Sequence, residues 1–360
     1  MSTRVAGTVA AARPASLHLP KSRRPLALAL VGLLALAAAL VFGVALGNVA
    51  VPVADTLALL AKRLLGWPVA VTWPAAAETI VLELRLPRVL TAMATGTALA
   101  LAGATFQGLL RNPLADPYVL GTASGAALGA AVGLLIPVQL ALLGFGLMHL
   151  LAFAGALLAV AVVYRLSRLG ELNSLTSVLL TGYAVGSLLA AGLAMTMYLS
   201  GSHLRQIFFY LLGSFSLSSW QQLLVGLPII AIGAVVILGR ARALNALLLG
   251  EETAAHLGLK VGRERLVLLA AATLVTAAAV ALSGLIGFVG LVVPHLVRLL
   301  VGANARLLLP LSALFGASFL AFADLFARMP GELPVGIVTA VIGAPFFLYL
   351  LRRYRAGYAL

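Results

Sequence analysis

Long runs of apolar residues dominate this chain and limit what it can fold into. A run of about 20 such residues is long enough to cross the hydrocarbon core of a bilayer as one α-helix. A helix satisfies its own backbone hydrogen bonds in lipid, whereas the strands of a membrane β-barrel would appear as shorter segments of alternating polarity. The sequence therefore predicts an all-α, polytopic membrane protein.

The pattern of these runs predicts ten transmembrane helices. They form one domain over residues 25–355, which follows a basic tail at 1–24 and contains a long inner loop at 240–264. The approximate extents of the spans are 26–47, 88–110, 117–136, 139–164, 173–198, 221–239, 265–283, 287–301, 307–327 and 335–351.

The composition excludes several classes of protein. Hydrophobic residues make up 62% of the 360 positions and charged residues only 9%, too few to cover the surface of a soluble globule of this size. A cytosolic enzyme and a disordered chain are thereby excluded. The chain contains no cysteine, which excludes disulfides, thiolate metal sites and cysteine nucleophiles.

The basic residues predict how the bundle is oriented. With the N-terminus inside and the spans alternating, about three quarters of the 24 lysines and arginines fall in inner segments, as the positive-inside rule requires. Both termini are then cytoplasmic. This placement at helix ends accounts for the formal charge of +14, so we expect no nucleic-acid partner. The first apolar run is too long for a signal peptide, so we interpret it as the first span.

Two of the connections contain helical patterns of their own. In the outer loop, Val53–Leu65 has apolar residues at helical spacing and predicts an interfacial helix. In the inner loop, Leu247–Leu259 predicts one short amphipathic helix. Glycines also recur at every fourth position from Gly121 to Gly133, which marks a helix side suited to close packing, either within the subunit or between subunits.

The sequence carries none of the familiar motifs for nucleotide binding or hydrolysis: no phosphate-binding glycine loop, no zinc-protease motif and no serine-hydrolase motif. Its five histidines lack ligand spacing, so we expect no metal and no cofactor on the chain. Asp324 is the one ionisable residue clearly inside a predicted span, and Arg328 follows at a spacing that permits an ion pair. So little charge within the spans argues against an ion-coupled carrier.

A series of short motifs runs in order along the chain from residue 85 onward. They are Arg85-Leu-Pro-Arg88, Gln107-Gly-Leu-Leu-Arg111-Asn-Pro-Leu-Ala-Asp-Pro117, Leu211-Leu-Gly-Ser214, Leu249-Gly250-Glu251, His256-Leu-Gly258, Gly284-Leu-Ile-Gly-Phe-Val-Gly-Leu-Val-Val-Pro-His-Leu-Val-Arg298, Ala323-Asp324, Glu332-Leu-Pro-Val-Gly336 and Gly343-Ala-Pro-Phe346. With these motifs the chain resembles the FecCD-like permease subunits of type II ATP-binding-cassette (ABC) importers, which serve iron–siderophore complexes, haem and vitamin B12.

The resemblance implies the ten-helix fold of the vitamin B12 importer permease and a transport subunit without enzymatic activity of its own. Two permeases, identical or homologous, would form a dimer around a path lined by the fifth and tenth spans. Two ABC ATPase subunits, which hold ATP and Mg²⁺, would dock on the inner side. A periplasmic or extracellular substrate-binding protein would dock outside, and the whole would sit among lipid in the bacterial cytoplasmic membrane.

The resemblance also assigns an outer docking role. Arg85, Arg88 and Arg328 match the arginines that the family presents to acidic side chains of the binding protein, and we expect them at the outer rim. We expect the second helix to begin at Pro87, between the first two. By residue type alone, these arginines are interfacial anchors whose heads reach toward water.

Two further sets of residues acquire roles in the same way. Asn112 and Leu114 match the inner gate of the family, and Thr176 matches a second gate; by residue type alone, 112–117 is a simple inner turn. The inner loop matches the element that couples the permease to the ATPase. The residues assigned to that coupling are Leu249, Gly250, Glu251, His256, Leu257 and Gly258.

We therefore expect a permease subunit that admits an iron chelate, haem or cobalamin to the cytoplasm while partner subunits hydrolyse ATP. The alternative mechanism is a secondary active carrier, and the alternative cargo is an oxyanion such as molybdate. An intramembrane enzyme would need paired catalytic groups within the spans, where only Asp324 is available. The family serves all of these cargoes, so the sequence leaves the cargo open.

Overall fold

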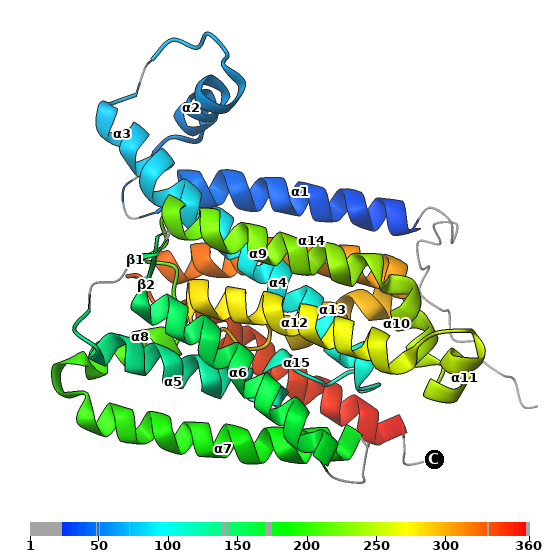
Figure 1. Ribbon diagram of the computed structural model, residues 1–360. Helices are drawn as coiled ribbons and strands as arrows, with labels where there is room; N and C mark the ends of the chain where they lie inside the picture. Colours follow the sequence, from blue (N-terminus) through cyan, green and yellow to red (C-terminus); the bar gives the residue numbers. More distant parts are fainter. Residues whose placement is uncertain are drawn as a thin grey trace, which may run out of the picture.

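The computed structural model of the chain describes residues 24–47, 49, 51–71, 73–138, 141–142, 144–169, 175–329 and 331–357. These residues form a bundle of long helices, with α2 and α3 projecting at one end and α10 and α11 gathered at the other (Figure 1). By the predicted orientation, the first end is outer and the second is inner. The basic tail predicted at 1–24 lies outside the described residues except for Arg24.

Within the described part of the chain, seven helices are long and apolar enough to cross a membrane. They are α1 (Arg24–Ala45), the continuous segment α3–η1–α4 (Ala75–Leu109), α6 (Leu147–Leu169), α7 (Leu175–Leu199), α9 (Trp220–Gly239), α12 (Val261–Ser283) and α14 (Ala305–Arg328). Three shorter apolar helices are α5 (Thr122–Leu135), α13 (Val289–Val301) and α15 (Val335–Gly357). These ten segments overlap the ten predicted spans in the same order, and the all-α membrane fold is confirmed.

Shorter elements connect the spans. They are α2 (Val53–Leu65), η2 (Pro117–Leu120), β1 (Ala141–Leu142), β2 (Phe145–Gly146), η3 (Gly201–His203), α8 (Leu204–Leu211), α10 (Ala241–Leu248) and α11 (Glu251–His256). The two strands pair as a small antiparallel hairpin. Helix α2 has the bounds that its periodicity predicts, and it ends at Gly66, whose left-handed conformation closes the helix.

The second span begins earlier than the sequence analysis predicts. A helix start at Pro87 is wrong, because the helix begins at Ala75, directly after Pro74. Its turns over Ile80–Arg85 are π-helical and continue into α4 (Leu86–Leu109). Proline lacks the N–H that would bond to the carbonyl group four residues back, and a widened π turn accommodates that gap. The helix therefore passes through Pro87.

The inner loop also differs from its prediction. One amphipathic helix over Leu247–Leu259 is wrong, because α10 ends at Leu248 and α11 begins at Glu251. Between them Gly250 has a φ of 123°, which residues with a side chain rarely adopt. A sharp turn at Leu249–Gly250 therefore separates two short helices.

Glycine allows the central helices to approach one another closely. A Cβ atom on Gly103 of α4 would stand 1.8 Å from the carbonyl oxygen of Gly290 on α13, so no larger residue fits. On α5, a Cβ atom on Gly129 would stand 2.0 Å from the carbonyl oxygen of Leu151 on α6. The glycine stripe of α5 thus packs against α6 within the subunit, which decides between the two interpretations of that stripe.

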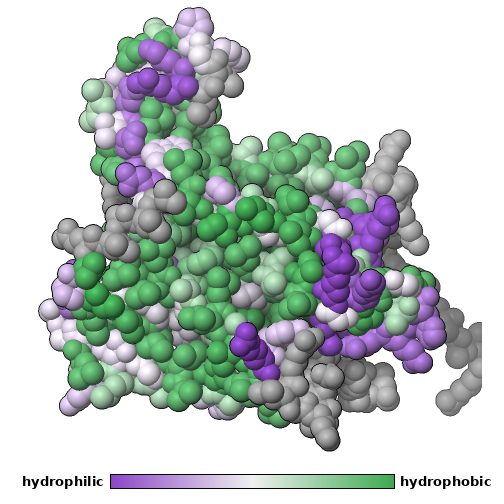
Figure 2. All heavy atoms as spheres, viewed as in Figure 1, coloured by the Kyte–Doolittle hydropathy of each residue, from purple (hydrophilic) through white to green (hydrophobic). Residues whose placement is uncertain are grey.

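The surface of the bundle is divided by polarity along its length. Figure 2 shows apolar residues over the sides of the helices, and hydrophilic residues gathered on α2 and α3 at one end and around α10 and α11 at the other. Such a surface suits a bundle that crosses a bilayer, because the apolar sides face lipid and the polar ends face water.

Candidate functional site

The outer end of the bundle holds a buried ion cluster between α4 and α14. The Asp324 carboxylate accepts hydrogen bonds from Nε of Arg88 at 3.1 and 3.2 Å and from its Nη2 at 3.0 Å. Arg328 brings its Nε to within 3.2 Å of the same carboxylate, which confirms the ion pair predicted from their spacing. Asp324 therefore joins two guanidinium groups that the sequence places on different helices.

The third arginine of the expected docking set has different partners. Arg85 donates from Nη1 to the carbonyl oxygens of Val44 and Ala45 at 3.1 and 2.6 Å, and from Nη2 to the carbonyl oxygen of Val49. Those carbonyls lie at the end of α1 and in the connection that follows it. The orphan carbonyls at a helix C-terminus carry partial negative charge, so they suit a cation.

The exposure of these arginines corrects one expectation. Arg85, Arg88 and Arg328 are 6%, 8% and 4% exposed, so none of them is a free charge on the outer rim. The physical reason is that the helix extends outward to Ala75 and α1 packs beside it, so the guanidinium groups meet carbonyls and a carboxylate instead of water. The interfacial-anchor interpretation fails on the same ground.

One carboxylate of the cluster remains partly in solvent. Glu332, in the connection between α14 and α15, places Oε1 3.6 Å from Nη1 of Arg88, and its side chain is 49% exposed. Its backbone φ of 59° is unusual for a residue with a side chain. Two guanidinium groups thus face two carboxylates, while Arg85 adds a third positive charge that is bound to backbone carbonyls. Glu332 is the carboxylate that solvent reaches.

The expected inner gate forms a tight turn between α4 and η2. Oδ1 of Asn112 accepts a hydrogen bond from the backbone N–H of Leu114 at 2.9 Å, while the rest of the Asn112 side chain is exposed. Asp116 closes the turn by accepting from the backbone N–H of Tyr118 at 2.8 Å. Burial raises the pKa of Asp116 to about 6, against the opposing effect of that hydrogen bond.

The second expected gate residue, Thr176, lies at the start of α7. Its side chain is outside the described part of the structure, as are residues 170–174, which precede the helix.

The expected coupling residues surround the turn between α10 and α11. Leu249 and Leu257 are 67% and 62% exposed although both are large and apolar. Glu251, His256 and Gly258 are exposed as well. Two leucines in water at a polar end of the bundle are costly unless a partner covers them, so this element has the character of a docking surface.

Polar contacts that the sequence analysis did not predict attach this element to the bundle. Nε of Arg111, in the gate turn, donates to the carbonyl oxygen of Leu247 in the last turn of α10 at 3.1 Å. Oδ1 of Asn245 accepts from the backbone N–H of Ala305 at 2.7 Å and so satisfies a free N–H group in the first turn of α14, next to its N-cap residue Asn304. Arg111 belongs to a quoted motif, but its partner is 136 residues away and no local pattern identifies it.

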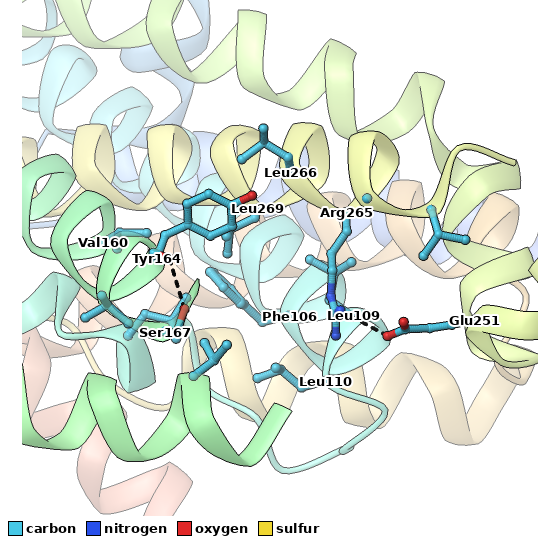
Figure 3. A pocket seen from close by; sticks show the side chains of 15 residues that line it. Phe106, Leu109, Leu110, Val160, Tyr164, Ser167, Glu251, Arg265, Leu266 and Leu269 are labelled. Atoms are coloured by element: carbon cyan, nitrogen blue, oxygen red, sulfur yellow. Dashed lines mark hydrogen bonds and ion pairs between the residues drawn. The ribbon is translucent and has the colours of Figure 1, made fainter. Parts of the chain in front are cut away.

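A cavity of about 370 Å³ lies beside the coupling element, between α4, α6, α7, α11 and α12. Figure 3 shows apolar side chains such as Phe106 and Leu269 on its walls and the pair Glu251–Arg265 at one edge. That ion pair joins α11 to α12 at 3.0 Å. Ala254 of α11 is fully buried in the main apolar core, so this short helix is attached by apolar packing as well as by the ion pair.

Two of the spans are unusually exposed for helices of a bundle. Only 6% of the most apolar stretch of α7 is buried, and Tyr183 and Leu188 on it are 77% and 73% exposed. On α15, Val341 is 68% exposed and borders a hollow of about 480 Å³ shared with the end of α8 and the connection that precedes α13. These are the fifth and tenth spans, which the family resemblance expects along the transport path.

The chain matches the FecCD transport family over residues 33–353. The cobalamin import system permease of Halobacterium salinarum is 45% identical over 280 residues, which cover 78% of this chain and 75% of that protein. The hemin transport system permease of Yersinia pestis is 44% identical over 279 residues, which cover 76% of this chain and 83% of that protein.

A solved structure has the same fold. It is described as an inward-facing conformation of a metal-chelate type ABC transporter, and it superposes on this chain with a TM-score of 0.76 at 32% sequence identity. The match covers 91% of this chain and 99% of the solved chain.

Proposed function

This chain belongs to the FecCD transport family, and we propose that it forms the membrane path of a binding-protein-dependent ABC importer, through which a metal chelate enters the cytoplasm. Relatives of the chain are permease subunits of ABC transporters, and the secondary-carrier alternative has no support among them. The observation that carries the proposal is the full-length match in fold to a metal-chelate type ABC transporter.

The ATPase subunits dock on the exposed turn between α10 and α11. Leu249 and Leu257 supply the apolar contact, and the turn is held by Arg111 to the gate and by Glu251–Arg265 to α12. A movement of the ATPase can therefore reach the gate turn through one hydrogen bond. Two copies of the permease, each with one ATPase subunit, enclose the path between their α7 and α15 helices.

The binding protein docks at the outer arginine cluster by exchanging carboxylates. An acidic side chain of the partner takes the place of Glu332 beside Arg88, since Glu332 is the partly exposed carboxylate of the cluster. Arg85 and Arg328 add positive charge to the site. Their own donors are already bound to backbone carbonyls and to Asp324, so Arg88 is the arginine that contacts the partner. Charge complementarity of this kind mainly raises the association rate.

The cargo class is a bulky metal chelate: an iron–siderophore complex, haem or cobalamin. The matched relatives named for cobalamin and hemin transport support this class. Among the described residues, no group of three or more histidines and carboxylates is placed to hold a metal ion. The chain would thus pass the chelate whole instead of binding its metal directly.

The proposal is tested by assembly and uptake. The permease is co-expressed with its candidate ATPase, and ATPase activity is measured for the permease alone and for the complex. Vesicles containing the complex are then offered iron–siderophore, haem, cobalamin and molybdate together with the cognate binding protein. ATP-dependent uptake of one chelate is expected; uptake without any ATPase, or of molybdate only, would overturn the proposal.

The docking surface is tested with matched variants. Leu257→Glu is expected to release the ATPase, because it places a charge in an apolar contact. Leu217→Glu is the control, since Leu217 is 79% exposed at the opposite end of the bundle. Equal ATPase retention in both variants would show that the α10–α11 turn is not the docking surface.

A further inference from the structure

The projecting arm formed by α2 and α3 has an apolar surface that the transport function does not use. Inside the arm, Leu59 and Leu60 are buried and pack in one cluster with Trp73 and Ala77. On another side of α2, Val53 and Leu57 stay 36% and 47% exposed. One side of α2 packs within the arm. The exposed apolar residues on its other side need a second apolar surface to cover them.

That exposed surface continues the lipid-facing side of α1. Only 22% of the most apolar stretch of α1 is buried, so most of this helix faces lipid in a membrane. Exposed apolar residues continue past its end: Phe42 lies near the end of α1, Leu46 and Val49 lie in the connection, and Val53 and Leu57 lie on α2. Figure 1 shows α2 beside the outer end of α1, displaced sideways from the bundle.

The connection after α2 adds an aromatic residue suited to a membrane–water boundary. Trp67 is 62% exposed and Val71 is 59% exposed. Tryptophan is favoured at this boundary because its ring is apolar and its N–H is polar. Lys62 and Arg63 lie one turn before it, where basic groups meet lipid phosphates, and Arg63 also pairs with Glu78 on α3.

We propose that the arm docks on the bilayer surface, with Val53, Leu57 and Trp67 inserted among the phospholipid headgroups of the leaflet at the α2 end of the bundle. Docking would fix the connection between α1 and α2. Val49 in that connection accepts a hydrogen bond from Arg85, so the lipid surface would also steady one arginine of the outer cluster. The occupant is lipid, because the exposed apolar residues of the arm follow along the chain from α1, a span-length apolar helix whose surface is mostly exposed.

Tryptophan fluorescence tests the proposal directly, because the chain contains 3 tryptophans. Trp73 is buried, and Trp220 donates from Nε1 to the carbonyl oxygen of Leu82 at 2.8 Å. The full chain is placed in nanodiscs of phosphatidylcholine and phosphatidylglycerol whose acyl chains carry bromine near the glycerol end or near the methyl end. The signal of Trp67 is the difference between the fluorescence of the unmodified chain and that of Trp67→Phe, which retains Trp73 and Trp220.

Stronger quenching by bromine near the glycerol end, with protection from aqueous acrylamide, is the expected result. Leu57→Lys should at least halve that quenching, whereas Leu217→Lys, at another exposed leucine, should not. A Trp67 signal that acrylamide quenches fully and neither brominated lipid affects would overturn the proposal. Protection that appears only when a substrate-binding protein is added would also overturn it and would assign the surface to that protein. These readouts need neither ATPase nor cargo.

Discussion

Replacing Asp324 by asparagine should destabilise the protein strongly while leaving the shape of the side chain unchanged. The carboxylate is 1% exposed and is contacted by two guanidinium groups, with four nitrogen–oxygen distances between 3.0 and 3.2 Å. In Asp324→Asn both guanidinium groups remain buried and face each other without the anion. The distant Glu332 contact, at 3.6 Å, offsets little of this because Glu332 is half exposed.

The magnitude follows from that geometry. Removing one partner of a buried ion pair costs about 3–5 kcal/mol, because the remaining charge stays desolvated. The expected loss for Asp324→Asn lies in that range. The matched control is Glu78→Gln, which breaks the pair with Arg63, whose side chain is 61% exposed. A solvent-exposed pair contributes about 0–1 kcal/mol.

The assay is unfolding of the purified permease in mixed micelles, followed by circular dichroism, with a double-mutant cycle. Arg88→Met removes one of the stranded cations, so Asp324→Asn should cost less in the Arg88→Met background than alone. The reasoning is refuted if Asp324→Asn destabilises no more than Glu78→Gln. It is also refuted if the two substitutions at the cluster are additive, since contacting residues should couple.

Three further outcomes are expected. Gly103→Ala should destabilise by about 3 kcal/mol or more, because its Cβ atom would overlap a facing carbonyl oxygen at 1.8 Å, whereas Gly262→Ala, which meets open space, should be neutral or stabilising in the same unfolding assay. The pKa of Asp116 is about 6 in the folded chain, against an ordinary value of 3.8. Its contribution to stability is therefore full below about pH 4 and is lost as the pH rises through 6. Asp116→Asn should flatten the pH dependence of the melting temperature over that window. Arg111→Met should lower uptake per ATP hydrolysed several-fold without releasing the ATPase, whereas Arg242→Met, at an exposed arginine of α10, should not; equal transport ratios in the two variants would exclude the proposed link.

The outer docking proposal needs a gentler substitution than charge reversal. Arg88→Glu would set two carboxylates together inside the cluster and would damage the fold, so it cannot separate docking from stability. Glu332→Gln is better placed, because the residue is half exposed and competes for Arg88 from the surface. The affinity of the Glu332→Gln permease for the binding protein should rise. An affinity that falls would refute the exchange of carboxylates.

The sequence alone determined the elements whose causes are local. Ten apolar runs predicted ten spans, because a helix in lipid needs only its own length of apolar residues. The spacing of Asp324 and Arg328 predicted their ion pair, and the periodicity of Val53–Leu65 predicted the bounds of α2. The motifs also identified the family, because they can be recognised in the sequence without knowing which residues are in contact.

The tertiary structure decided which residues from distant spans meet. Asp324 pairs with Arg88, 236 positions away, and Arg111 reaches α10 across 136 positions. It also decided that the helix runs through Pro87 and that the arginines expected at the rim are buried. A local pattern fixes the period of a helix, but a partner on another helix depends on how close the backbones come, and here glycines such as Gly103 set that approach.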